Sequence, residues 1–99
     1  MMGTASRKVP DGKLVSVRVA YDERITACTL RGDFFLEPPE ALADLERAVE
    51  GLPADATVDR IAAAVETVDA TLVGFDATDV GRAVRAAVDG TSPDDRPSA

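Results

Sequence analysis

The sequence predicts a small α+β domain, in which an antiparallel β-meander of two to three strands carries helices packed on one face. Between residues 13 and 21, apolar and polar residues alternate with the period of two that is typical of half-buried strands. After residue 38, apolar residues recur at helical spacing, with Pro or Gly near the ends of the segments. A chain of 99 residues can bury one modest core, and two domains would leave each half without one. We therefore expect one domain over residues 6–90, with flexible tails at 1–5 and 91–99.

The strands are expected in the first third of the chain. Ser6–Val9 is a candidate first strand, and the Pro-Asp-Gly segment at 10–12 is its turn. Lys13–Tyr21 alternates and is followed by a tight turn at 22–23. Its apolar positions share one face: Val15, Val17, Val19 and Tyr21. Arg24–Arg31 returns as a strand whose faces are less clearly sorted, which leaves a bulge or burial on both faces open.

The first helix is expected after Pro38, because Pro39 suits the first helical position. Its apolar stripe consists of Ala41, Leu42, Leu45, Ala48 and Val49. Gly51 is placed to end this helix. The carboxylates of the segment spread around its polar face, and we interpret them as a solvated surface: Asp44, Glu46 and Glu50.

Two further helices complete the expected fold. One runs from Val58 to about Val68 and is capped by Thr57 or Asp55. The other runs from Ala77 to Val88 and is capped by Asp76. Their spacing predicts these buried residues: Ile61, Ala62, Val65, Val68, Val80, Ala83, Val84, Ala87 and Val88.

The charge balance is strongly acidic, with a net charge of −7 and no histidine. Lysine occurs only at positions 8 and 13, and most of the acidic residues are Asp. This composition predicts a salt-rich cytoplasm in which charge repulsion is screened, and the codon bias of a high-GC genome is the alternative. An acidic chain is a poor candidate for binding nucleic acid or an anionic membrane. The sequence shows neither a signal peptide nor the roughly 18–20 consecutive apolar residues that span a membrane, so a cytoplasmic location is expected.

Residues that usually carry chemistry are missing from the sequence. There is no His for acid–base catalysis, no Ser–His or Cys–His pair and no Gly-rich phosphate loop. A single Cys without His predicts no disulfide and no metal site built from this chain alone. Cys28 lies in mid-strand, so we interpret it as a small buried hydrophobic residue, and a reactive thiol is the alternative. An enzyme acting alone is therefore not expected.

Lys8 and Lys13 form the first candidate binding segment. They flank one turn in a chain that otherwise lacks lysine, so they face either an anionic group of a partner or only solvent. Gly12 in this turn is expected to take a positive φ whatever the function.

Phe34 and Phe35, which follow Gly32 and Asp33, form the second candidate binding segment. If the strand continues through them, their side chains point to opposite faces of the sheet. Helices cover only one face, so we expect one ring in the core and the other on a surface that a partner covers. The alternative is a bend at Gly32 or Pro38 that buries both rings.

The order of these segments resembles the small accessory domain of lipoate–protein ligases, which in some archaea is a separate chain, the second subunit of a two-chain ligase. The turn motif of that domain corresponds to Lys8, Pro10, Gly12, Lys13 and Leu14. Its second motif corresponds to Gly32, Asp33, Phe34 and Phe35, and its next helix to Leu42, Leu45 and Glu46. The match is good over residues 8–52 and weaker over 74–90.

The resemblance implies a non-catalytic subunit that the large catalytic subunit requires when it activates lipoate with ATP to lipoyl-AMP. It implies that lipoate and ATP bind to the large subunit, that this chain alone binds no cofactor, and that lipoyl-domain acceptor proteins are indirect partners. The implied partner-binding residues are Lys8, Pro10, Gly12, Lys13, Gly32, Asp33, Phe34 and Phe35.

The implied fold is similar to that of the sulfur-acceptor and scaffold proteins of iron–sulfur assembly, although this chain lacks their exposed, reactive cysteine. A stand-alone scaffold or interaction module of iron–sulfur or sulfur-transfer assembly is therefore the alternative function. A generic salt-adapted interaction domain is a third.

Overall fold

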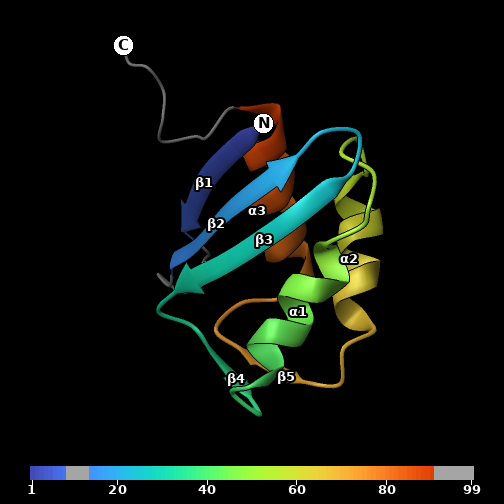
Figure 1. The fold of residues 1–99 in the computed structure, drawn as a ribbon. Coiled ribbons are helices and arrows are strands. Elements are labelled where there is room, and N and C mark those ends of the chain that lie inside the picture. Colours follow the sequence, from blue (N-terminus) through green and yellow to red (C-terminus); the bar gives the residue numbers. More distant parts are fainter. Residues whose placement is uncertain (9–13, 91–99) are drawn as a thin grey trace.

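The computed structural model describes residues 1–8 and 14–90, and it confirms the predicted α+β fold (Figure 1). The main sheet is an antiparallel meander with the strand order β1-β2-β3. Its strands are β1 (Met2–Lys8), β2 (Leu14–Tyr21) and β3 (Ile25–Gly32). A second, two-stranded antiparallel sheet pairs β4 (Phe35–Glu37) with β5 (Thr71–Val73). The helices are α1 (Ala41–Val49), α2 (Val58–Glu66) and α3 (Ala77–Asp89).

The alternation of β2 is confirmed, because its three valines are buried. Tyr21 at the end of β2 is half-buried, and its hydroxyl donates a hydrogen bond to the carbonyl oxygen of Val88 at 2.8 Å. The bulge that the sequence left open is present, since the register of β2 and β3 shifts between Ala20 and Tyr21. Thr26 is the extra residue on β3, and its hydroxyl donates to the Ala20 carbonyl oxygen at 3.1 Å.

The prediction of a flexible tail at residues 1–5 is wrong, because β1 begins at Met2 and pairs with β2 along its whole length. Ala5 is buried, and a Cβ added at Gly3 would lie 1.9 Å from the Ala87 carbonyl oxygen. Small residues thus let β1 lie directly against α3. They also give β1 no apolar alternation that the sequence could reveal. Residues 91–99, the other predicted tail, lie outside the described residues.

The helix caps explain where the helices begin. The Thr57 hydroxyl, and not Asp55, caps α2 by accepting a hydrogen bond from the Arg60 N–H at 3.1 Å. Asp76 and Asp79 form a reciprocal capping box at the start of α3. Gly90 ends α3 in the left-handed conformation, with φ of 75°.

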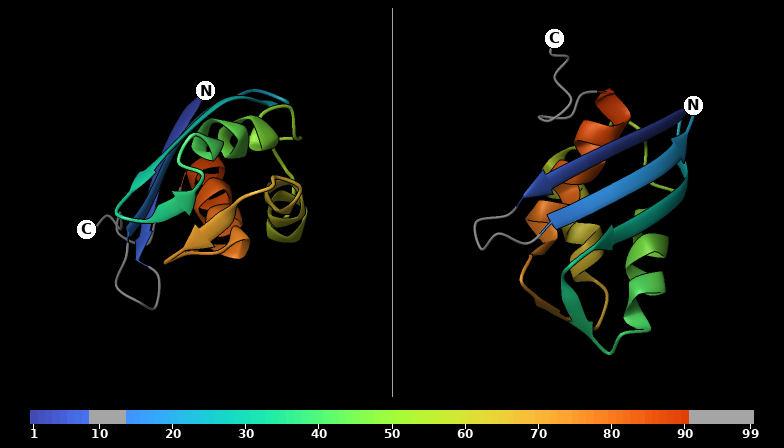
Figure 2. Two further views of the ribbon diagram at one scale, coloured as in Figure 1. Left: turned by 90° about the horizontal axis from the view of Figure 1, so that it is seen from below. Right: turned by 90° about the vertical axis from the view of Figure 1, so that its left-hand side faces the viewer.

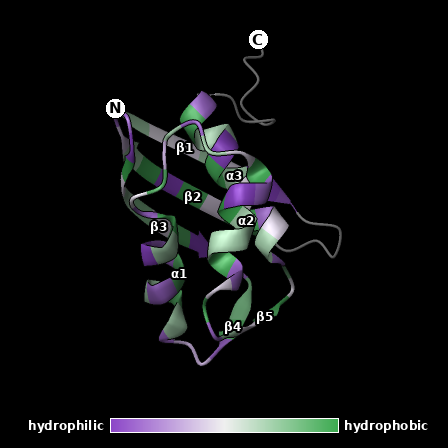
Figure 3. Ribbon diagram, turned by 90° about the vertical axis from the view of Figure 1, so that its right-hand side faces the viewer, coloured by the Kyte–Doolittle hydropathy of each residue, from purple (hydrophilic) through white to green (hydrophobic). Residues whose placement is uncertain are grey.

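The elements form a sheet layer and a helix layer (Figure 2). α3 lies across β1 and β2, α1 packs on β3, and α2 packs on α3. Buried residues from both layers form one hydrophobic cluster. Hydrophobic and hydrophilic residues alternate along the strands, and each helix carries residues of both kinds, as expected of amphipathic elements (Figure 3). No helix in the described part of the chain has the length and apolar character to cross a membrane.

Candidate functional site

Lys8 and Leu14, the described residues of the first sequence motif, lie at the same end of the main sheet as the second motif. β2 and β3 pair in antiparallel register, so that Val15 lies opposite Gly32. The next residues, Leu14 and Asp33, are joined by two hydrogen bonds. The Leu14 N–H donates to Asp33 Oδ1 at 2.8 Å, and the Asp33 N–H donates to the Leu14 carbonyl oxygen at 3.3 Å. Asp33 thus connects the start of β2 to the segment that carries the two phenylalanines.

Gly32 is required where β3 ends. Its φ is 155°, and an added Cβ would lie 2.0 Å from the Leu14 carbonyl oxygen. No side chain fits so close to a backbone oxygen, and glycine has none. The chain therefore leaves the main sheet at this residue and enters β4.

Phe34 and Phe35 have different surroundings, as the sequence predicted. The Phe34 ring packs on Phe75, with ring centroids 4.3 Å apart, and it contacts the core cluster. Phe35 is 66% exposed and lies opposite Val73, itself 46% exposed, in the β4–β5 ladder. The two phenylalanines do not lie on a continuing β3, because the chain bends at Gly32. The alternative from the sequence was a bend that buries both rings. The bend is present, but it buries Phe34 only in part and leaves Phe35 exposed.

A groove runs beside Phe35, between β3, β4 and α1. Its volume is about 640 Å³. Its apolar lining is Leu30, Phe34, Phe35, Leu36, Pro39 and Leu42. We call this the β3–α1 groove. Together with the exposed Phe35–Val73 pair it forms an apolar surface, and such surfaces mark protein-binding sites.

Glu46 of α1 and Glu50, the residue that follows the helix, bind the outer edge of β3 next to this groove. Glu46 Oε2 accepts a hydrogen bond from the Leu30 N–H at 2.8 Å, and Glu50 Oε2 accepts one from the Cys28 N–H at 3.2 Å. Both N–H groups belong to the outer side of β3, where no further strand is present in the described part of the chain. The interpretation as solvated surface is therefore wrong for Glu46, which is half-buried, whereas Glu50 is exposed and also bonds the edge of the sheet. The signal that could have found them is their spacing of one helical turn beside the apolar stripe.

Lys8 lies at the end of β1, opposite Leu14, and is exposed. The other predicted residues of the turn, Pro10, Gly12 and Lys13, lie outside the described residues. The sequence reasoning did not find Val73, because its pairing with Phe35 joins segments far apart in the chain.

Cys28 is buried in β3 and faces the core. Burial, and to a smaller extent the nearby carboxylates of Glu46 and Glu50, raise the pKa of its thiol to about 12. The thiol therefore stays protonated at neutral pH and has little of the thiolate that reacts with electrophiles or metals. Across residues 1–8 and 14–90, no group of three or more His, Cys, Asp or Glu side chains could hold a metal ion.

Comparison with known proteins gives one informative match. No family model matches the chain, and neither does any curated protein. A solved chain from an archaeal lipoylation system, a bi-partite lipoate protein ligase and its E2 lipoyl domain from Thermoplasma acidophilum, matches with a TM-score of 0.70. The match covers 86% of this chain and 96% of that chain, at 22% sequence identity. The two chains share one fold.

Proposed function

We propose that this chain is the non-catalytic accessory subunit of a two-chain lipoate–protein ligase, required for the ATP-dependent activation of lipoate to lipoyl-AMP by the large subunit. The observation that carries the proposal is the fold shared with a chain of a bi-partite ligase system over nearly the whole length of that chain. The motifs found from the sequence are an independent support, since Asp33 joins the start of β2 to the segment of Phe34 and Phe35.

The proposed role is to dock on the large subunit and to order its active-site loops. Phe35 is the proposed anchor, because large exposed aromatic side chains contribute most to protein interfaces when a partner covers them. Ordered loops exclude water from the site where the lipoate carboxylate attacks ATP. This role requires no acid–base residue from the accessory chain.

The alternative function in iron–sulfur or sulfur-transfer assembly needs a reactive cysteine. Burial and the raised pKa of Cys28 are unfavourable for that chemistry. We therefore propose the ligase function in preference to it.

The test is reconstitution from separately purified chains. A ligase gene in the same genome that lacks its own C-terminal domain identifies the large subunit. Lipoate-dependent exchange of pyrophosphate into ATP measures adenylate formation. We expect exchange only when both chains are present. Equal exchange by the large subunit alone would contradict the proposal, and lipoyl-AMP formed by the isolated small chain would contradict its non-catalytic part.

A further inference from the structure

The three strands of the main sheet contain no acidic residue, although the chain has 18 of them and a net charge of −7. One face of this sheet carries the helices, and no described element covers the other (Figure 2). We call the uncovered side the open face. The register and the burial pattern place these residues on it: Thr4, Ser6, Lys8, Leu14, Ser16, Arg18, Ala20, Ala27, Thr29 and Arg31.

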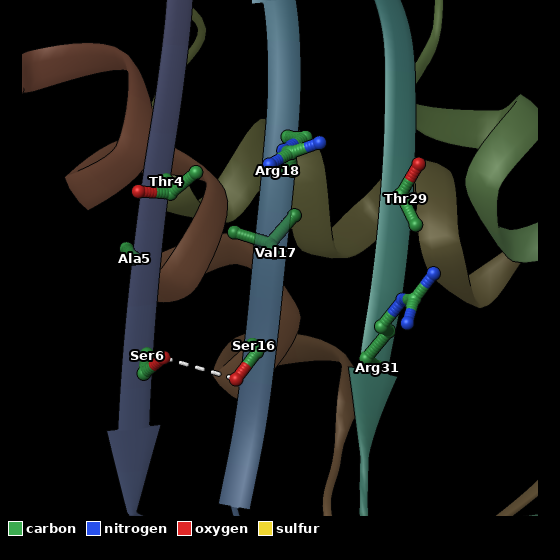
Figure 4. Close-up of a pocket in the computed structure, with 8 residues that line it drawn as sticks. All are labelled: Thr4, Ala5, Ser6, Ser16, Val17, Arg18, Thr29 and Arg31. Atoms are coloured by element: carbon green, nitrogen blue, oxygen red, sulfur yellow. Dashed lines mark hydrogen bonds between the residues drawn. The ribbon is translucent and has the colours of Figure 1, made fainter.

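Arg18 and Arg31 stand on the open face, on neighbouring strands. Arg18 lies opposite Thr29, and Arg31 lies opposite Ser16 in the ladder. Both arginines line a hollow of about 390 Å³, together with Ser6 and Ser16. Figure 4 shows these side chains on the neighbouring strands. The two serine hydroxyls are joined by a hydrogen bond of 2.9 Å.

Neither arginine has a partner among residues 1–8 and 14–90. No ion pair or hydrogen bond involves the guanidinium groups of Arg18 and Arg31, and both side chains are exposed. In contrast, Arg7 lies 3.7 Å from Asp79, and Arg85 donates to two backbone carbonyl oxygens and to Asp89. In such an acidic chain, an uncovered face with two unpaired cations and no carboxylate is complementary to an anion.

We propose that the open face binds a carboxylate-bearing segment of a protein partner, with Arg18 and Arg31 as the donors. Guanidinium groups form paired hydrogen bonds with carboxylates, and the serine and threonine hydroxyls beside them are further donors. This inference goes beyond the proposed function and does not depend on it.

The geometry favours a protein segment over other anions. The backbone N–H groups of the central strand β2 are used in pairing with β1 and β3, so a single small anion would be held by exposed side chains alone. A nucleic acid carries charge along its whole length and would meet the acidic helices around the sheet. A segment with several carboxylates can contact both arginines along the strands. At physiological ionic strength, screening over about 8 Å limits repulsion from the rest of the chain.

The test is an NMR titration of the full ¹⁵N-labelled chain with a hexaglutamate peptide, and with hexaglutamine as the uncharged control. We expect hexaglutamate to shift the amide signals of Ser16, Arg18, Thr29 and Arg31, and hexaglutamine to leave them unchanged. The double variant Arg18→Gln/Arg31→Gln should bind at least about fivefold more weakly, the loss expected for two exposed charge pairs.

The matched control is Arg60→Gln/Arg82→Gln, which makes the same change of charge at two exposed helix arginines without a partner in the described part of the chain. This variant should bind hexaglutamate like the wild type. Circular dichroism establishes that both variants fold. Equal weakening in both variants, or no shift on the open face, would overturn the inference. Inorganic phosphate or a short DNA duplex that shifts the same signals at lower concentration than the peptide would also overturn it, in favour of that ligand.

Discussion

At the scale of single residues, Phe34 and Phe35 show how neighbouring side chains take separate roles. The sequence predicted one buried and one exposed ring but could not say which. Gly32 and Asp33 determine which ring is buried, because they fix the direction in which the chain leaves β3. Phe34 then packs on Phe75, and Phe35 lies in the short β4 strand with its ring mostly exposed.

We expect Phe34→Ala to reduce stability and Phe35→Ala to reduce partner binding. Phe34→Ala removes the contact with Phe75 and should lower the free energy of unfolding by about 3 kcal/mol, the lower end for Phe truncation because the ring is half-buried. Phe35→Ala should change it by less than about 0.5 kcal/mol but weaken binding to the large subunit. Chemical denaturation and calorimetric titration measure the two quantities. A large loss of stability from Phe35→Ala would show that this ring is structural.

Cys28 gives a prediction about pH. The unfolded thiol has a pKa of 9.0 and the folded one a pKa of about 12, so between these values only the unfolded state loses the proton. The contribution of this group to stability is complete below pH 9 and is lost as the pH rises towards 12, by about 1.4 kcal/mol per pH unit. Cys28→Ala should lack this component. We expect the wild type to lose stability more steeply than the variant above pH 9 in urea denaturation. Parallel curves would contradict the raised pKa.

At the scale of elements, α1 protects the outer edge of β3. Edge strands expose N–H groups that can pair with other chains, and Glu46 and Glu50 occupy two of these groups. The same carboxylates raise the pKa of Cys28. Glu46 and Glu50 therefore act both on the edge of the sheet and on the thiol, whose pKa is raised mainly by burial.

Truncation of Glu46 tests this role of α1. Glu46→Ala leaves the Leu30 N–H without its acceptor and should cost about 1–2 kcal/mol of stability. Glu46→Gln keeps an acceptor oxygen and should recover most of this loss, while lowering the pKa of Cys28 because it removes the negative charge. Asp44→Ala is the control, since its pair with Arg47 lies on the surface and contributes little. Equal losses of stability in the Asp44 and Glu46 variants would show that Glu46 contributes no more than an ordinary surface residue.

At the scale of the whole molecule, the net charge of −7 makes stability depend on salt. Repulsion between the exposed acids is screened over about 10 Å at 0.1 M salt and about 3 Å at 1 M. We expect the melting temperature to rise over this range, and to rise less in the double variant Glu66→Gln/Asp69→Asn, which removes two exposed charges. Thermal melts at increasing KCl measure both. A melting temperature that does not change with KCl concentration would favour codon bias over salt adaptation as the origin of the acidic composition.

The sequence predicted the parts of the fold that have a local signal. Alternation revealed β2, and the caps at Thr57 and Asp76 marked two helices. It missed β4 and β5, which are three residues long each and form only because distant segments pair. It missed the start of β1 because small residues at 3 and 5 serve close packing on α3 and carry no periodicity. For the candidate site, the sequence drew attention to the segment of Phe34 and Phe35, and its assignment as a binding site stays a prediction. Val73, Glu46 and Glu50 were missed because their contacts are tertiary.

The packing of α3 on β1 and β2 has a consequence for biosynthesis. Tyr21 and Val88, joined by a hydrogen bond, are 67 residues apart in the chain. At about 5–20 residues per second, a ribosome takes roughly 3–13 s to add that length. During this time the valine face of the nascent sheet lacks the helix that covers it in the finished protein. A chain that stops before α3 would therefore expose the valine side chains that this helix covers in the complete fold.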